Sequence, residues 1–269
     1  MHHQIIKTFA KINIGLNIVA KRNDGFHNIE TLFYPINDLY DELVFEDSND
    51  FQFNSEYKFD NIILKTVQAL EERTNRELCI KISLKKNIPI GAGLGGGSSN
   101  AAGTLVALNR ICDLNLSTIE LKNIALELGS DVPFFLQDKP AIGKSRGEYL
   151  TNVDLKIVQP ILLVNPGIQV STKEAFSNIT PKSVRFNYDE IVKLPINQYS
   201  HHIVNDFESS IFQKYPEIEN IKDILNSNGA LFASMSGTGS TVYGIFEDIE
   251  AAENASEKFP DEYFTFISQ

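Results

Sequence analysis

A glycine-rich stretch between Pro89 and Ala102 limits what this chain can fold into more than any other feature. Glycine loses more backbone freedom on folding than other residues, and it lets a second group come close to the main chain. A simple turn seldom needs several glycines followed by two serines. The stretch therefore predicts a loop that wraps closely around another group. Its glycines are Gly91, Gly93, Gly95, Gly96 and Gly97.

The flanking segments predict a strand before this loop and a helix after it. Apolar and polar residues alternate from Leu78 to Leu84, which is the period of a half-buried strand. From Ala101 to Cys112 the apolar residues recur at helical spacing. Where a loop joins a strand to a helix, backbone N–H groups and the positive end of the helix dipole converge on one point. The sequence therefore predicts a phosphate-binding site at this loop.

Two common phosphate-binding patterns do not fit these residues well. The Walker pattern requires a lysine where Gly97 stands. A dinucleotide fingerprint can be placed on three of the glycines, but its helix should lead to a second strand that ends in a ribose-binding acid. Asp113 lies at the right distance, yet residues 100–128 are predicted to form helix, turn and helix.

The loop resembles that of the GHMP small-molecule kinases, whose pattern is P-x-x-x-G-L-G-S/G-S-S/A. The resemblance implies that the loop wraps the phosphates of ATP, with Ser98 or Ser99 as a hydroxyl donor. It also implies Mg²⁺ as a cofactor, although the sequence does not identify the ligands of the metal. The predicted cofactor-binding residues are Pro89, Ile90, Gly91, Ala92, Gly93, Leu94, Gly95, Gly96, Gly97, Ser98 and Ser99.

A second segment, near the N-terminus, also bears on this resemblance. Residues 12–18 alternate between apolar and polar, which predicts a strand with one apolar face. Side chains two residues apart on a strand share a face, so Lys11 and Asn13 point in the same direction. By spacing alone, a solvated strand face is the simpler interpretation. The segment also resembles the A-K-x-N strand of the GHMP kinases, which favours a functional site.

The residues from Asp24 to His27 predict a hairpin with an aromatic side chain near its turn. The Asp24-Gly25 pair lies between two strand-like segments, which is a strong hairpin signal. An exposed Phe26 beside His27 could stack on a planar base, with the imidazole bonded to the edge of that base. A buried Phe26 would instead anchor the hairpin to the core. The residues alone do not distinguish these two interpretations.

Asp131 lies at the predicted start of a short helix. Pro133 is typical of the first helical turn, which makes Ser130 or Asp131 the N-cap. An N-cap aspartate is usually structural, because it accepts hydrogen bonds from unpaired N–H groups. The segment from Gly129 to Pro133 nevertheless resembles the one that carries the catalytic aspartate in one GHMP subfamily.

A second small-residue loop contains Gly237, Thr238 and Gly239, and as a hairpin turn it would need no function. It resembles the third GHMP motif, which in that family lies against the first loop. With three motifs in the family's order, the sequence is identified as a member of the GHMP kinases. The resemblance implies a two-domain α+β fold. Residues 1–152 would form an ATP-binding domain like ribosomal protein S5 domain 2, and residues 153–269 a ferredoxin-like domain.

Four further segments, which begin at Gly25, Gly129, Pro166 and Asn205, resemble one GHMP subfamily. This resemblance implies a small-molecule substrate, cytidine diphosphate-linked methylerythritol, whose 2-hydroxyl receives the γ-phosphoryl group of ATP. It places the reaction in the non-mevalonate synthesis of isoprenoid precursors. Family members commonly have tyrosine where Phe26 stands, so a hydrogen bond from that hydroxyl would be absent here.

The resemblance also implies a role for each candidate residue. Asp131 would accept or orient the proton of the hydroxyl, and Lys11, paired with Asp131, would stabilise charge during transfer. Phe26 and Phe176 would sandwich the cytosine, and His27 would read its polar edge. The catalytic residues are thus Lys11 and Asp131. The substrate-binding residues are Asn13, Phe26, His27, Thr172, Phe176, Gly237, Thr238 and Gly239.

Composition excludes several classes of partner. A net charge of −11 disfavours nucleic acid and anionic membrane surfaces, because both carry negative charge. Cys79 and Cys112 form no disulfide framework, which is typical of a reducing compartment. The N-terminus carries no signal sequence, and no apolar run approaches the roughly 18 residues that span a bilayer. We therefore expect a cytoplasmic protein, either a monomer or a homodimer.

Alternative functions remain open at this stage. Another GHMP kinase, of the homoserine or mevalonate type, would not need the paired aromatic residues. A non-catalytic nucleotide-binding protein would bind ATP without turning it over, and a dinucleotide oxidoreductase would need a different loop. Phosphate transfer to a panel of alcohols would separate the kinases from one another.

Overall fold

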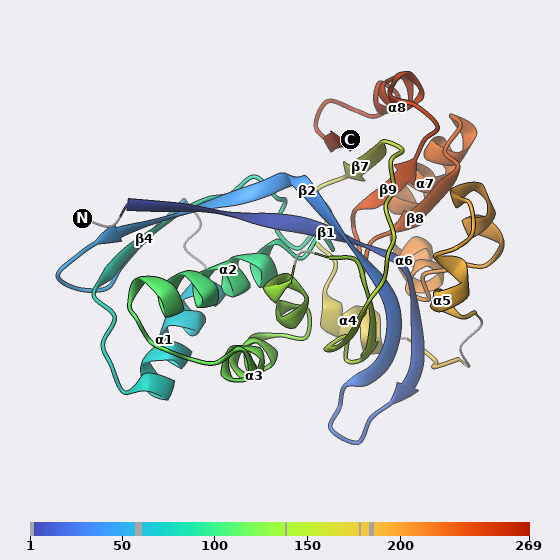
Figure 1. Cartoon of the computed structure of the whole chain (residues 1–269). Coiled ribbons are helices and arrows are strands. Elements are labelled where there is room, and N and C mark those ends of the chain that lie inside the picture. Colours follow the sequence, from blue (N-terminus) through green and yellow to red (C-terminus); the bar gives the residue numbers. More distant parts are fainter. Residues whose placement is uncertain (1–2, 57–60, 138, 178, 183–185) are drawn as a thin grey trace. The chain divides into compact units, whose positions relative to one another are not determined.

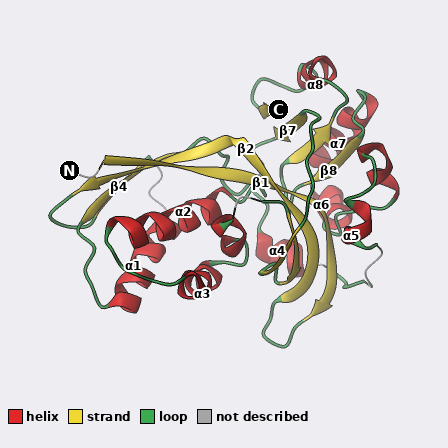
Figure 2. Ribbon diagram, in the orientation of Figure 1, coloured by secondary structure: helices red, strands yellow, loops and turns green. Residues whose placement is uncertain are grey.

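The computed structural model describes residues 3–56, 61–137, 139–177, 179–182 and 186–269, and strands alternate with helices along the chain (Figures 1 and 2). Contacts divide the chain into two compact units. The first unit comprises Met1–Ala10, Leu39–Ile90 and Gly95–Asp138. The second unit comprises Lys11–Asp38, Gly91–Leu94 and Lys139–Gln269. The predicted boundary between residues 152 and 153 refers to family domains rather than to these units, and it stays a prediction.

Two long strands contribute residues to both units. β1 (His3–Lys21) and β2 (His27–Asp47) form the predicted hairpin, in which Gly25 adopts a φ of +86°. β2 is long because its two halves pair with different partners. Residues 42–47 pair with β4 (Ile80–Lys85), and residues 29–33 pair with β5 (Ala141–Ser145).

The first unit combines strands with helices in the order expected for a domain like ribosomal protein S5 domain 2. β3 (Gln52–Ser55) runs parallel to β4, which is antiparallel to β2. One apolar core of this unit is formed by β2, β4 and four helices. Those helices are α1 (Ile62–Thr74), α2 (Gly96–Ile111), α3 (Thr118–Leu128) and the 3₁₀ helix η1 (Val132–Leu136).

Local sequence signals account for where these helices begin. Ser117 and Glu120 exchange hydrogen bonds between side chain and backbone, and this capping box sets the start of α3. The apolar spacing placed the second helix from Asn100 onward, but α2 already begins at Gly96. Gly95, with a φ of +71°, is its N-cap, so the helix grows directly out of the glycine loop.

The second unit contains a four-stranded antiparallel sheet in the order β10-β7-β9-β8. Along the chain this sheet is built as strand, helices, two strands, helix and strand, which is the ferredoxin-like arrangement. The predicted C-terminal fold is therefore confirmed. The strands are β7 (Ile161–Asn165), β8 (Phe232–Met235), β9 (Val242–Ile245) and β10 (Phe264–Ser268).

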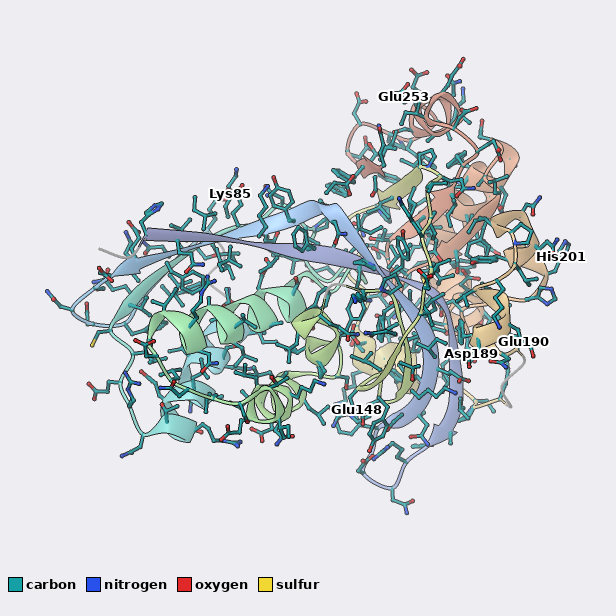
Figure 3. The ribbon with its side chains drawn as sticks, in the orientation of Figure 1. Lys85, Glu148, Asp189, Glu190, His201 and Glu253 are labelled. Carbon is teal, nitrogen blue, oxygen red and sulfur yellow. The ribbon has the colours of Figure 1, made fainter. Side chains whose placement is uncertain are left out.

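The remaining elements of the second unit are short. β6 (Tyr149–Asn152) pairs with β5 in an antiparallel ladder. Polar side chains such as His201 and Glu253 project outward from the helices (Figure 3). None of the helices that the structure describes is long and apolar enough to cross a membrane. The helices of the second unit are α4 (Thr172–Ser177), α5 (Tyr188–Ile191), η2 (Ile196–His201), α6 (Glu208–Lys214), α7 (Pro216–Ser227) and α8 (Ile249–Ser256).

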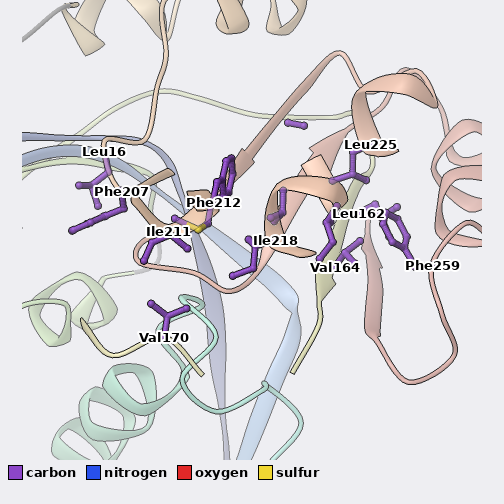
Figure 4. Close-up of a cluster of buried hydrophobic side chains, with 14 of the residues drawn as sticks. Leu16, Leu162, Val164, Val170, Phe207, Ile211, Phe212, Ile218, Leu225 and Phe259 are labelled. Carbon is purple, nitrogen blue, oxygen red and sulfur yellow. The ribbon is translucent and has the colours of Figure 1, made fainter. Parts of the chain in front are cut away.

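The core of the second unit lies between its sheet and its helices (Figure 4). Leu162 and Val164 of β7 are fully buried there, together with Leu225 of α7. Leu16 of β1 and Phe207, just before α6, join the same cluster. This packing fixes β1 and the start of α6 within the unit that carries several of the predicted site residues.

Candidate active site

Lys11 lies on β1 and has a buried side chain, 2% exposed. Its ammonium group donates to Asn13 Oδ1 at 2.5 Å and to the Gly93 carbonyl oxygen at 2.8 Å. Asn13 is also 2% exposed. The two side chains share a face of the strand as the period predicted, but that face is not solvated. Because a buried charge must be well supplied with hydrogen bonds, this lysine is held in one place.

Asn13 is itself oriented by two residues that sequence reasoning missed. Its amide Nδ2 donates to Thr31 Oγ1 at 3.0 Å, which turns Oδ1 toward the Lys11 ammonium. Its backbone N–H donates to Ser236 Oγ at 3.1 Å. The Ser236 hydroxyl in turn donates to the Gly93 carbonyl at 2.8 Å, so this oxygen accepts from both Ser236 and Lys11. Ser236 directly precedes the third motif, a signal that could have revealed it.

The first half of the glycine loop, which belongs to the second unit, packs against residues 236–241. The Lys11 N–H donates to the Leu94 carbonyl at 2.9 Å, and the Thr241 N–H donates to the Ala92 carbonyl at 3.1 Å. Gly93 has a φ of +78°, and a Cβ built on it would lie 2.1 Å from the Ser236 carbonyl oxygen. Glycine is therefore required here both by the dihedral angle and by the space available.

The second half of the loop belongs to the first unit and forms the start of α2. The Ser99 N–H donates to the Gly95 carbonyl at 2.9 Å, and no side chain caps the helix. The first amides of an α-helix have no partner within the helix, and the positive end of its dipole lies among them. Ser99 is 3% exposed whereas Ser98 is half-buried, so Ser98 is the more accessible hydroxyl. Such a helix start suits an anion.

The loop that contains Gly237, Thr238 and Gly239 is held in place by the segment from Asn205 to Glu208. The Asn205 amide donates to the carbonyls of Met235 and Gly237, both at 2.8 Å. The Glu208 carboxylate accepts from the Met235 N–H at 2.8 Å. Gly237 and Gly239 both adopt positive φ angles, while Thr238 between them is half-buried. The sequence singled out this acidic segment without giving it a role, and the structure gives it a supporting one.

Asp131 precedes η1, with φ −86° and ψ −14°. Asp131 occupies the predicted N-cap position of η1, but its side chain makes no capping hydrogen bond to the helix. The backbone carbonyl of Asp131 instead accepts from the Phe134 N–H at 3.2 Å. The catalytic role that the family resemblance implies for Asp131 stays a prediction.

The aromatic candidates occupy two different environments. Phe26, near the hairpin turn, is 46% exposed, so it does not anchor the hairpin in the core. The Arg146 guanidinium lies over its ring, 3.7 Å from the centroid. His27 is 9% exposed and stacks on Phe176, with centroids 5.0 Å apart and planes at 26°. Thr172 is exposed at the start of α4. The predicted sandwich of Phe26 and Phe176 stays a prediction.

We expect His27 to make the fold sensitive to acid. Burial lowers the pKa of its imidazole, whose ordinary value is 6.5. As the pH falls below 6.5, the unfolded chain binds a proton that the folded chain does not yet bind, so the free energy of unfolding decreases. Above about pH 7.5 this penalty is absent, because the imidazole is neutral in both states. Replacing His27 by glutamine should make this decrease in the free energy of unfolding smaller.

Urea unfolding at pH 7.5 and 5.5 checks this prediction. The change in the free energy of unfolding between the two pH values should be smaller in His27→Gln than in the wild type. His201 is exposed, so His201→Gln serves as the control and should behave like the wild type. An equal change in His27→Gln and the wild type would contradict the prediction.

A buried lysine tied to the first half of a glycine loop, with a second loop packed on that half, suits a nucleotide-dependent phosphotransferase. Models of known families agree with this conclusion. The GHMP kinases N terminal domain matches residues 61–139, and GHMP kinases C terminal matches residues 194–265. The chain belongs to the GHMP kinase family.

Comparison with individual proteins shows which members of this family the chain resembles. A protein of Parabacteroides distasonis named 4-diphosphocytidyl-2-C-methyl-D-erythritol kinase is 44% identical over 245 residues, which cover 88% of this chain and 90% of the relative. The crystal structure of a 4-(cytidine 5'-diphospho)-2C-methyl-D-erythritol kinase superposes with a TM-score of 0.85 at 30% identity, covering 98% of each chain. The homoserine kinase from Cytophaga hutchinsonii has a TM-score of 0.64 at 19% identity, covers 100% of this chain and 97% of its own, and is similar in fold alone.

These comparisons confirm the predicted family, the fold class and an enzyme that transfers phosphate to a hydroxyl group. The homoserine and mevalonate types are not favoured, nor are a non-catalytic nucleotide-binding protein or an oxidoreductase. The roles of the individual site residues stay predictions.

Proposed function

We propose that this protein transfers the γ-phosphoryl group of ATP to the 2-hydroxyl of 4-diphosphocytidyl-2-C-methyl-D-erythritol. The reaction belongs to the non-mevalonate synthesis of isoprenoid precursors. The observation that carries the proposal is the buried Lys11 ammonium, bonded at 2.8 Å to the Gly93 carbonyl of the glycine loop. A cation fixed to a phosphate loop suits a reaction in which negative charge has to be neutralised.

Phosphoryl transfer needs positioning and charge neutralisation more than covalent chemistry. In the proposed mechanism, the loop from Pro89 to Ser99 holds the ATP phosphates against its amides and the positive end of α2. Asp131 accepts the proton of the substrate hydroxyl, or orients it. Lys11 stabilises the charge that develops during transfer, while Asn13 helps to place the substrate.

The donor atoms fit a Mg²⁺ ion that is held mainly by the nucleotide. Among the described residues, no three His, Cys, Asp or Glu side chains are grouped closely enough to hold a metal by themselves. Mg²⁺ is usually bound through one or two protein oxygens together with phosphates and waters. Ser98 and Asp131 offer oxygen atoms of this kind. When bound, the ion would neutralise phosphate charge.

The cytidine end of the substrate is assigned to the hairpin and to α4. Phe26 is exposed and can stack on the cytosine, and the stacking of His27 on Phe176 fixes the imidazole that would read the edge of the base. One face of Phe176 is therefore already covered, and any contact with the base uses the rest of this ring. Thr172 and the loop Gly237-Thr238-Gly239 would contact the remainder of the substrate.

We expect Phe26→Ala to weaken binding of the cytidine substrate roughly ten- to a hundredfold, because stacking on an aromatic side chain contributes about 1 to 3 kcal/mol. Phe26→Tyr keeps the ring, so its affinity should stay within a few-fold of the wild type. The ring is 46% exposed, so neither variant should unfold the protein. Calorimetric titration of the substrate, together with melting temperatures, measures both effects. Unchanged affinity in Phe26→Ala would remove this residue from the site.

A cytoplasmic location is part of the proposal. Cys79 and Cys112 are both free thiols, which suits the reducing compartment where ATP is also abundant. Whether the protein acts as a monomer or a homodimer stays a prediction, and sedimentation at working concentration would decide it.

A coupled ADP-release assay tests the proposed function directly. With ATP and Mg²⁺, the wild-type protein should release ADP when 4-diphosphocytidyl-2-C-methyl-D-erythritol is added. Homoserine and mevalonate serve as matched acceptors and should give no release above the background. Release with either of these acceptors, or binding of ATP without turnover of the cytidyl substrate, would contradict the proposal.

A further inference from the structure

A buried ion pair lies in the first unit, immediately before the glycine loop. The Lys86 ammonium donates to Asp41 Oδ2 at 2.6 Å, and the two side chains are 9% and 0% exposed. Asp41 Oδ1 accepts from the backbone N–H groups of Asn87 and Ile88, both at 2.8 Å. Lys86 also donates to the Ile88 carbonyl at 2.7 Å. Together these bonds fix the chain between the end of β4 and Pro89.

The same ammonium lies against the first residue of α2. A Cβ built on Gly96 would lie 2.8 Å from Lys86 Nζ and 3.0 Å from Ile88 Cγ2. Gly96 is buried, so the helix start packs directly on the charged end of this lysine. Glycine at this position allows the close approach. Lys86 therefore contacts the part of the loop whose amides point to the predicted phosphates.

A gain in folding stability does not by itself explain why the Lys86–Asp41 pair lies at the start of α2. The amide end of a helix carries partial positive charge, so a cation placed there is unfavourable by a few tenths to about 1 kcal/mol. A buried ion pair often contributes no net stability, since desolvation offsets the attraction between its charges. Burial also lowers the pKa of Lys86, and the carboxylate of Asp41 acts against that shift. A bound anion would turn the unfavourable arrangement into a favourable one.

We propose that Lys86, held by Asp41, is a positioning residue for the nucleotide phosphates. It packs against Gly96 at the start of α2, and together with Asp41 it fixes the chain that leads into the glycine loop. The inference rests on the proposed function in one respect, namely that the glycine loop binds ATP. A purely structural ion pair would make a different prediction, because its loss would affect every ligand of the folded protein equally.

The neighbouring ion pair provides a matched control. Lys85 and Glu42 lie one residue away on the same two segments, at 3.6 Å, but Lys85 is 68% exposed and projects from the ribbon (Figure 3). The test variant is the double substitution Asp41→Asn with Lys86→Met, because removing only one charge would leave the other buried and unpaired. The control variant is Glu42→Gln with Lys85→Met. Melting temperatures establish that both variants are folded.

The two variants are compared with the wild type by calorimetric titration of ADP and by competition with adenosine. The test variant should bind ADP roughly ten- to a hundredfold more weakly, the scale of a lost hydrogen bond or contact to a charged group. Adenosine has no phosphates, so its affinity should stay within about twofold of the wild-type value. The KM for ATP should rise in parallel, while the KM for the cytidyl substrate stays constant. The control variant should match the wild type with both ligands.

Two results would overturn the inference. One is an equal loss of ADP and adenosine affinity in the test variant, which would make the pair structural. The other is unchanged ADP affinity in a folded test variant. Both leave the proposed function intact, since wild-type protein would still bind ADP and release it from ATP with the cytidyl substrate. If the wild-type protein itself failed to bind ADP, the proposed function would fail first.

Discussion

Asp131→Asn is expected to lower the turnover number at least about a hundredfold, which is the scale of a lost general base. The substitution keeps the shape of the side chain and removes its ability to accept a proton as a carboxylate. The Asp131 side chain makes no capping bond to η1, so the helix should not lose its start. We therefore expect the melting temperature and the ADP affinity to stay close to those of the wild type.

An aspartate that does cap a helix provides the control. Asp248 precedes α8, and its side chain accepts from the Ala251 N–H at 2.9 Å. Asp248→Ala should lower the free energy of unfolding by about 1 kcal/mol and leave turnover unchanged. Asp131→Asn should instead lower turnover with little effect on the free energy of unfolding. Steady-state ADP release and urea unfolding measure both quantities for all variants. Near-normal turnover in Asp131→Asn would show that this carboxylate is not the acceptor of the proton.

Gly93→Ala is expected to destabilise the protein by about 2 to 5 kcal/mol, the sum of a left-handed dihedral strain and an overpacked contact. The new Cβ would lie 2.1 Å from the Ser236 carbonyl oxygen, so the loop has to move away from residues 236–241. The Gly93 carbonyl would move with it and weaken its bond to Lys11. The KM for ATP should therefore rise steeply in any fraction that remains folded.

Gly91→Ala separates the two causes. Gly91 also has a left-handed φ, +66°, but an added Cβ would meet nothing within 4 Å. This variant should lose only about 1 to 2 kcal/mol, the strain of the dihedral alone. Urea unfolding of both variants gives the difference that belongs to the contact with Ser236. Equal losses in Gly91→Ala and Gly93→Ala would contradict the close packing of the loop.

The features that could be predicted from the sequence are those that depend on neighbours along the chain. The period of β1 placed Lys11 and Asn13 on one face, and they are joined by a 2.5 Å hydrogen bond. The Asp24-Gly25 pair predicted the hairpin because few residues tolerate its positive φ. The glycine loop could be recognised from the sequence for the same reason, because its positive φ angles and close contacts favour glycine over other residues.

The features that escaped prediction depend on residues far apart in sequence. Ser236 bonds to the backbone of Asn13 across 223 positions, and no local pattern indicates that partner. β2 continues through a polar segment because separate strands pair with its two halves, which only the assembled sheet determines. Asp131 had every local mark of an N-cap, yet its side chain does not cap. Tertiary contacts decided each of these cases.

The interleaving of the two compact units has a consequence for how the chain matures on the ribosome. Lys11 and Asn13 are synthesised long before Ser236, which bonds to Asn13 across 223 positions, and before Thr241, which bonds to Ala92. Contacts between such distant segments form slowly, because the intervening chain has to be closed into a loop. A polypeptide released before Ser236 would therefore lack the groups that hold Asn13 and the first half of the glycine loop in place. Products truncated before this point should be inactive even where their helices have formed.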